Sequence, residues 1–454
     1  MNPITRRQAL SALALTGASA LVPRNAFANS AATVPVLSAG DRQQASARLL
    51  EYFAQAAPQL LRPAKGFLSH PNISPSLPGK QYSSTLWDWD TLWTVQGLFQ
   101  VARLTKDTAL RDRIALHAQG SLKIFLAQQS AEGRIPMLVT VTQADLLGAL
   151  TPSPDGPNPR NQAKPVFAQL ALLIADELND ATWLAPLFDQ LLKFHASWTN
   201  HNLSKTGLLV WGNDVAIGND NDPATFGRPF FSSANLLLNT LYYQDLKAAA
   251  KLATRLGRGA EATQLTTQAG ALGAALLKHC WDPRDQFFYT VDVQCVDKRR
   301  ELINYPPGMD MSWSSVPLKI QSFTGFLPLW CGLATREQAA ALVQANYVAD
   351  QRFRADGGVR SLSSLEPMYC MDASSNPSNW LGPVWIIVNY LTWRALKNYG
   401  FAAEAQDLAD KTLRLLADDL AATGSLNEYY HPDTGAAISH KGFVDWNLLA
   451  VEMI

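Results

Sequence analysis

The chain has 454 residues, of which 47% are hydrophobic, enough for one large globular domain or two ordinary ones. Lysine and arginine together number 38, as do aspartate and glutamate, so the formal net charge is zero, and no long basic run occurs. Nucleic acid and anionic membrane surfaces are therefore not expected as partners.

The first 28 residues have the pattern of an export signal. Arg6 and Arg7 form a twin-arginine motif, residues 9–22 are an apolar stretch too short to span a bilayer, and residues 26–28 are a small-residue cleavage site. The alternative is a disordered basic amino terminus. We expect cleavage before Asn29 and export of the folded protein to the bacterial periplasm. No later run reaches eighteen uninterrupted apolar residues, so no membrane contact is expected after cleavage.

Apolar residues recur with the period of an α-helix through most of the remaining chain, as in residues 49–57. Strand signals are sparse, with short hairpins expected at 286–295 and around 436–440. No linker or composition shift divides residues 29–454, which are expected to form a single domain of helical hairpins. The predicted helices lie approximately at 41–57, 90–104, 108–127, 165–179, 182–199, 231–257, 259–280, 322–333, 336–348, 380–399, 401–421 and 443–454.

An acidic loop is centred on Asp220. Aspartates and asparagines crowd residues 213–222, and the neighbouring glycines and proline interrupt regular structure. Ser232 or Ser233 is predicted to cap the helix that follows, which would hold the loop at the end of a rigid element. The alternatives to a functional carboxylate are a solvated turn and a calcium loop. The calcium interpretation fits poorly, because EF-hand spacing from Asp220 would need an acid at Phe231.

Polar loops rich in tryptophan fall between successive predicted helices, and in a ring of helical hairpins they would gather at one end. Flat aromatic faces in a cleft suit the C–H faces of sugar rings, although tryptophan is more often part of a core. In chain order these motifs lie at residues 86–90, 133–136, 161–165, in the Asp220 loop, and at residues 358–363, 379–385 and 428–435.

From Tyr82 to the carboxyl terminus, these seven motifs resemble, in the same order, the clan of inverting glycoside hydrolases with an (α/α)6 barrel, and within it family 63. That family includes processing α-glucosidase I and the bacterial mannosylglycerate and glucosylglycerate hydrolases. A single Trp-Asp motif is a weak signal, whereas seven motifs in order are a strong one. The resemblance implies an all-α, (α/α)6 toroid of about twelve helices, with short β-hairpins in the loops.

The resemblance also implies roles for individual residues. It places the general acid at Asp220, within a Gly-x-Asp-Asn motif, and the general base at Glu428, within a Glu-x-Tyr-x-Pro-x-Thr-Gly motif. Without the resemblance, Glu428 is a surface acid before a turn, and the tryptophans of residues 379–385 are core residues. The residues implied to bind substrate are Trp89, Asp90, Gln162, Gly218, Trp380, Trp385 and Trp446.

Two departures from the family pattern bear on the substrate. The family often has arginine where this chain has Leu381, and Gln-Pro-Pro where residues 162–165 read Gln-Ala-Lys-Pro. A polar contact to the substrate is therefore lost or moved. The resemblance implies an inverting, exo-acting α-glycosidase that releases glucose, or alternatively mannose, from a short α-linked glycoside.

Physical chemistry agrees with two carboxyl groups in these roles. Glycoside hydrolysis needs one protonated carboxyl to meet the leaving oxygen and one carboxylate to activate water or attack directly. An acid that stays protonated near neutral pH needs a raised pKa. For Asp220 we expect this from enclosure by tryptophan and from Asp90, Asp214 or Asp222 nearby.

Other chemistries lack their motifs in this sequence. It contains no GxSxG after the signal, no HExxH, no Cys/His cluster, no P-loop and no GxGxxG, so no metal or cofactor is expected. A noncatalytic sugar-binding protein would keep the aromatic residues but would not need both acids. A sugar epimerase on a related helical barrel would use histidines, and the seven histidines are scattered. The expected partner is a small carbohydrate substrate.

Overall fold

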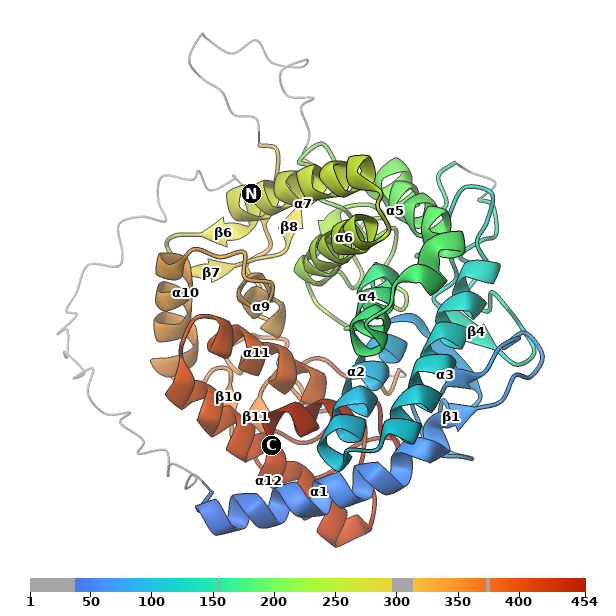
Figure 1. Cartoon of the computed structure of the whole chain (residues 1–454). Coiled ribbons are helices and arrows are strands. Elements are labelled where there is room, and N and C mark those ends of the chain that lie inside the picture. Colours follow the sequence, from blue (N-terminus) through green and yellow to red (C-terminus); the bar gives the residue numbers. More distant parts are fainter. Residues whose placement is uncertain (1–36, 154–155, 296–312, 373–375) are drawn as a thin grey trace, which may run out of the picture. The chain divides into compact units, whose positions relative to one another are not determined.

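The helices pair into hairpins, and one helix of each pair lies on an inner ring (Figure 1). Successive inner helices contact one another, and the last contacts the first, so the ring closes. The inner members are α2 (Asp88–Thr105), α4 (Phe167–Leu178), α6 (Leu236–Arg255), α9 (Leu327–Trp330), α11 (Ile386–Asn398) and the 3-10 helix η4 (Trp446–Met453).

An outer ring of helices surrounds the inner one (Figure 1). It comprises α1 (Ala39–Leu60), α3 (Thr108–Ala127), α5 (Phe188–Asn202), α7 (Gly259–Cys280), α10 (Arg336–Val343) and α12 (Ala402–Thr423). Helix α1 packs on α12, which brings the first and last helical hairpins together. The predicted all-α, (α/α)6 toroid is confirmed.

This computed structural model describes residues 37–153, 156–295, 313–372 and 376–454. Residues 36–454 group into one compact unit. The predicted signal peptide at 1–28 lies outside the described residues and stays a prediction, which amino-terminal sequencing of the exported protein would test. Within the described ranges, none of the helices has both the length and the hydrophobicity that crossing a membrane requires.

The two rings differ because their sequences differ in hydrophobic pattern. Helix α6 is buried over most of its surface from Leu236 through Ala253, as expected for a helix enclosed by neighbours. Helix α7, outside it, buries a single stripe that includes Leu265, Ala269 and Leu276, and it leaves its polar side in water. The apolar core therefore lies between the rings and inside the inner one.

Two inner helices begin later than the sequence indicates. The predicted start at residue 231 is wrong because β5 (Ser233–Ala234) pairs with β8 (Val291–Asp292). Asn235, and neither predicted serine, caps α6, and its side chain accepts a hydrogen bond from the Leu237 N–H at 2.8 Å. Helix α11 begins at Ile386 rather than near residue 380, because the residues before it pair with other loops.

Short antiparallel pairings tie the loops together. The predicted hairpin at 286–295 is divided, since β7 pairs back on β6 while β8 joins β5 and β9. Near the carboxyl terminus Ala437 pairs with Tyr430, which agrees with the second predicted hairpin. The remaining elements are β1 (Leu61–Arg62), β2 (Asn72–Ile73), β3 (Thr85–Trp87), β4 (Leu138–Thr140), β6 (Trp281–Asp282), β7 (Phe287–Phe288), β9 (Val316–Pro317), β10 (Arg354–Ala355), β11 (Gly358–Val359), the 3-10 helices η1 (Thr182–Leu187) and η2 (Phe323–Phe326), and the π-helix η3 (Gln344–Val348).

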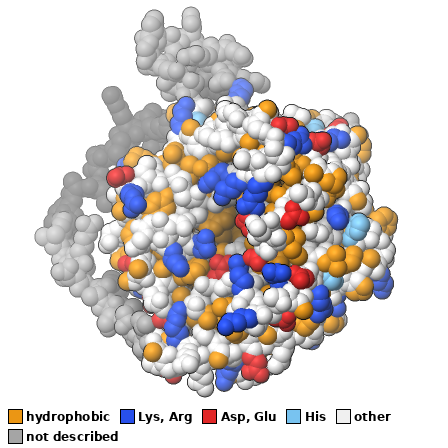
Figure 2. Space-filling view, viewed as in Figure 1, with side chains coloured by type: hydrophobic (Ala, Val, Ile, Leu, Met, Phe, Trp, Pro, Cys, Tyr) orange, Lys and Arg blue, Asp and Glu red, His pale blue; other side chains and the backbone are white. Residues whose placement is uncertain are grey.

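The face of the ring seen in Figure 2 carries basic and acidic side chains close to one another. Hydrophobic side chains are visible in a hollow at its centre. No large area of one charge is visible on this face, in keeping with the zero net charge of the sequence.

Candidate active site

The loops that precede the inner helices surround a cavity of about 390 Å³. Its walls come from segments far apart in the sequence: the first turn of α2, the loop before α6, the segment before α11, and the chain before and at the start of η4. Seven of the predicted site residues line it, namely Trp89, Asp90, Gly218, Asp220, Trp380, Glu428 and Trp446.

Gln162 and Trp385 are not among the described residues that line this cavity. Trp385 is fully buried and stacks behind Trp380, with ring centroids 4.0 Å apart and planes inclined by 7°. Gln162 is also buried, and its side-chain carbonyl accepts a hydrogen bond from the Ser197 hydroxyl at 3.0 Å. Trp385 therefore supports the wall from behind, whereas Gln162 is hydrogen-bonded to α5.

The aromatic walls brace one another. The Trp89 ring lies 5.9 Å from that of Trp446 in an edge-to-face arrangement, and 6.2 Å from that of Trp380. Behind Trp380, the stack continues through Trp385 to Tyr429 at 4.4 Å. Such pairs are favourable beyond the area they bury, and they hold flat apolar surfaces in fixed positions. These surfaces suit the C–H faces of a sugar ring.

Asp220 lies beside a glycine that the geometry requires. Gly218 has φ +100°, and a Cβ on it would stand 3.1 Å from Lys164 and 3.2 Å from the Trp89 ring. The Asp220 carboxyl accepts hydrogen bonds from the Ser378 and Asn376 side chains and from the Gly218 backbone. Burial raises the pKa of Asp220, while the Lys164 charge and these hydrogen bonds oppose the rise.

The neighbouring aspartates of the loop have other contacts. Asp222 accepts hydrogen bonds from the Ala224 N–H at 3.1 Å and from the Asn235 amide at 2.8 Å, so it fixes the turn that leads into α6. Asp214 accepts one from the Gly227 N–H at 2.7 Å. Burial is the principal cause of the raised pKa of Asp220, which agrees with the expected enclosure, and the expected effect of neighbouring aspartates stays a prediction.

A buried ion pair that the sequence did not reveal lies beneath Asp220. The Lys164 ammonium is 3.0 Å from Asp88 Oδ1, and both side chains are almost completely buried. The same ammonium lies 5.5 Å from the Trp89 ring centroid, within reach of a cation–π interaction. The sequence gives one sign of this pair: Lys164 lies within residues 162–165, where the chain departs from the family's Gln-Pro-Pro pattern.

Glu428 pairs with a histidine that the sequence analysis did not single out. The His440 Nδ1 is hydrogen-bonded to Glu428 Oε2, and it also lies 3.0 Å from the Ser439 hydroxyl. Burial and the charge of Asp220 raise the pKa of Glu428, whereas His440 and Ser439 lower it. The contact with Glu428 raises the pKa of His440. His440 therefore favours the ionised form of Glu428 that a general base requires.

Asp90 faces a second carboxyl group that the sequence analysis missed. Asp445 is fully buried, accepts a hydrogen bond from the Thr94 hydroxyl at 2.6 Å, and shares a side-chain hydrogen bond with Asp90. Two carboxyl groups in such contact need a shared proton. Burial raises the pKa of Asp90 to about 7, and burial together with the charge of Asp90 raises that of Asp445.

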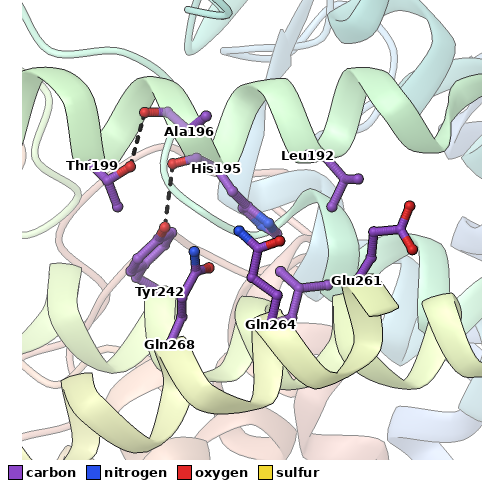
Figure 3. A pocket seen from close by; sticks show the side chains of 9 residues that line it. Leu192, His195, Ala196, Thr199, Tyr242, Glu261, Gln264 and Gln268 are labelled. Atoms are coloured by element: carbon purple, nitrogen blue, oxygen red, sulfur yellow. Dashed lines mark hydrogen bonds between the residues drawn. The ribbon is translucent and has the colours of Figure 1, made fainter. Parts of the chain in front are cut away.

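Among the described residues, no group of three or more histidine, cysteine, aspartate and glutamate side chains has the arrangement of a metal site. A second cavity, of about 250 Å³, lies between α5 and the α6–α7 hairpin (Figure 3). There His195 and Gln264 point toward each other, and His195 Nε2 is 2.7 Å from Asp245. This cavity contains neither predicted catalytic acid.

A family model, described as the mannosylglycerate hydrolase MGH1-like glycoside hydrolase domain, matches residues 87–444 of this chain. The chain belongs to this family. The match begins at Trp87, in the first motif of the predicted resemblance, and it includes Asp220 and Glu428. The predicted relationship to glycoside hydrolase family 63 is confirmed.

Curated relatives of this MGH1-like chain include mannosylglycerate hydrolases. That of Thermus thermophilus is 31% identical over 140 residues, which are 30% of this chain and 31% of that protein. Mannosylglycerate hydrolase MGH1 of Selaginella moellendorffii is 32% identical over 113 residues, which are 24% of this chain and 20% of that protein. The chain thus matches less than a third of the length of each of these relatives.

Solved structures share the fold of this MGH1-like chain. The GH63 mannosylglycerate hydrolase from Thermus thermophilus in complex with glucose has a TM-score of 0.63 at 21% identity, and the match covers 88% of this chain and 98% of that one. Neutral trehalase Nth1 from Saccharomyces cerevisiae has a TM-score of 0.56 at 15% identity, covering 85% and 73%. Both likenesses concern the fold.

Proposed function

We propose that this protein is an inverting, exo-acting α-glycosidase that removes one glucose or mannose unit from the nonreducing end of a short α-linked glycoside. The observation that carries the proposal is that Asp220 and Glu428, 208 positions apart in the sequence, line one cavity with tryptophan walls. A single pocket with aromatic walls suits removal of a terminal sugar better than internal cleavage of a long glucan.

Asp220 is the proposed general acid. Its burial keeps the carboxyl protonated at higher pH than an exposed aspartate, so it has a proton to donate to the leaving oxygen. Glu428 is the proposed general base. The contact with His440 favours its ionised form, which takes a proton from the attacking water. Attack from the face opposite the leaving group inverts the anomeric carbon.

The decisive experiment measures both activity and product stereochemistry. We expect Asp220→Asn and Glu428→Gln each to lower kcat by about 10²–10⁴-fold or more while the far-ultraviolet circular dichroism spectrum stays unchanged. A glycosyl fluoride, which needs little protonation to leave, should partly rescue Asp220→Asn. Proton NMR of the first product from an α-glycoside should show the β-anomer. An α-anomer, or wild-type turnover by Glu428→Gln, would contradict the mechanism.

The names of the relatives supply the first substrates to test. Mannosylglycerate hydrolase activity is what those proteins' names state. For this chain we place α-glucosides first and α-mannosides second, and mannosylglycerate belongs in the same panel. Release of internal fragments from a long α-glucan would contradict the exo-acting part of the proposal.

A further inference from the structure

Large apolar side chains stand exposed at the rim of the cavity that contains Asp220. Val215 is 50% exposed and Phe226 is 59% exposed, and both line the cavity, together with the half-buried Leu147. A single exposed apolar residue needs no explanation. Three that line one rim, beside a buried carboxyl group, are typical of a surface that binds an apolar ligand.

The backbone that carries these side chains is held in place. The Val215 N–H donates to the Asn213 side chain at 3.1 Å, and the Val215 carbonyl accepts from the Asn161 amide at 3.0 Å. The Phe226 N–H donates to the Asp222 carbonyl at 2.7 Å. Val215 and Phe226 are therefore presented at the rim by an ordered loop.

The position of the rim relative to the proposed acid identifies which part of a substrate would touch it. Trp89, Trp380 and Trp446 are each less than 5% exposed and form the deep part of the cavity, which suits the sugar ring. A general acid protonates the leaving oxygen, so the aglycone lies on the far side of that oxygen from the sugar. Val215 and Phe226 belong to the same loop as Asp220 and stand nearer the solvent.

Charge at the rim disfavours an acidic aglycone. Asp214 also lines the cavity, and an anionic leaving group would meet this carboxylate at close range. The Lys164 ammonium lines the cavity too, but it is bonded to Asp88 at 3.0 Å. The Asp88 carboxylate therefore offsets part of its attraction for an anionic aglycone.

We propose that Val215, Phe226 and Leu147 form an aglycone subsite for an apolar group, so that α-glycosides of aliphatic or aromatic alcohols are better substrates than glycosides of glycerate. This inference rests on the proposed α-glycosidase activity and adds the class of its leaving group. Each methylene that the subsite removes from water should raise kcat/KM by up to about fourfold.

The test uses methyl, propyl and hexyl α-glucosides and α-mannosides, whose alcohols differ little in leaving ability. In the wild type kcat/KM should rise with alkyl length, and Phe226→Ser should flatten that rise. Phe230→Ser is the matched control, because Phe230 is 57% exposed in the same segment but is not among the residues that line the cavity. The control should keep the wild-type dependence on alkyl length.

Two results would overturn the subsite: a wild-type kcat/KM that does not depend on alkyl length, or a glycerate glycoside that is preferred to the hexyl glycoside. If the wild type hydrolyses none of these glycosides, the proposed activity fails but the subsite is still tested. Calorimetric titration of Asp220→Asn with methyl and hexyl glycosides then measures binding alone. Affinity that rises with alkyl length would support the subsite, and equal affinities would overturn it.

Discussion

Replacing Lys164 by methionine tests the buried ion pair beneath the active site. The change removes an ammonium that is 2% exposed and leaves the fully buried Asp88 carboxylate without its cation. Breaking a buried pair in this way typically costs about 3–5 kcal/mol of stability. Asp88 keeps hydrogen bonds from the Lys164 and Trp89 N–H groups, at 2.6 and 2.7 Å, so we expect a loss near the lower end, about 3 kcal/mol.

Urea unfolding measures this loss, and two further variants control it. Lys319→Met is the matched surface control, because Lys319 is 46% exposed and pairs with Asp282 at 2.8 Å. It should cost less than about 1 kcal/mol. The double variant Lys164→Met with Asp88→Asn removes both charges, and it should be more stable than the sum of the two single losses predicts. A Lys164→Met loss as small as that of Lys319→Met would refute the reasoning.

The same substitution has a second, functional readout. The Lys164 charge lowers the pKa of Asp220 against the effect of burial. Without that charge the pKa of Asp220 should rise, so the proposed general acid stays protonated to higher pH. The alkaline limb of the kcat profile should therefore move to higher pH in Lys164→Met. A limb that moves to lower pH, or does not move, would contradict this electrostatic role.

Two further predictions concern the other carboxyl pairs. In His440→Gln the pKa of Glu428 should rise, because the histidine no longer opposes the effect of burial and only Ser439 still does. The acid limb of kcat/KM should therefore move to higher pH. A lower plateau with an unmoved limb would indicate that His440 has a merely structural role. Asp90 has a pKa of about 7 in the folded protein, above its unfolded value of about 3.9. Between these two values the folded protein holds a proton that the unfolded chain has lost. The free energy of unfolding should therefore fall as the pH rises from 4 to 7, by up to about 1.4 kcal/mol per pH unit. Asp445→Asn removes a second buried carboxyl group whose pKa is raised, so it should weaken this dependence in urea unfolding measured across that range, whereas a parallel dependence would show that Asp445 holds no proton in the folded protein.

Local pattern was sufficient to predict the helical hairpins and the order of the loops. Helical periodicity depends on neighbours three and four positions away, so a stretch such as residues 108–127 was predicted with the bounds that α3 has. The order of the tryptophan and acid motifs indicated the family, and Asp220 and Glu428 line one cavity. Closure of the ring then follows from successive pairing of short-range hairpins.

Contacts between distant segments determined where α6 begins, which buried charges pair, and which groups hold a proton. Ser233 belongs to a strand rather than a helix cap because Asp292, 59 positions later, supplies its pairing partner. Lys164 and Asp88 are 76 positions apart and form one ion pair. Tertiary packing, by excluding water from such groups, also determines their protonation, which no local pattern of residues encodes.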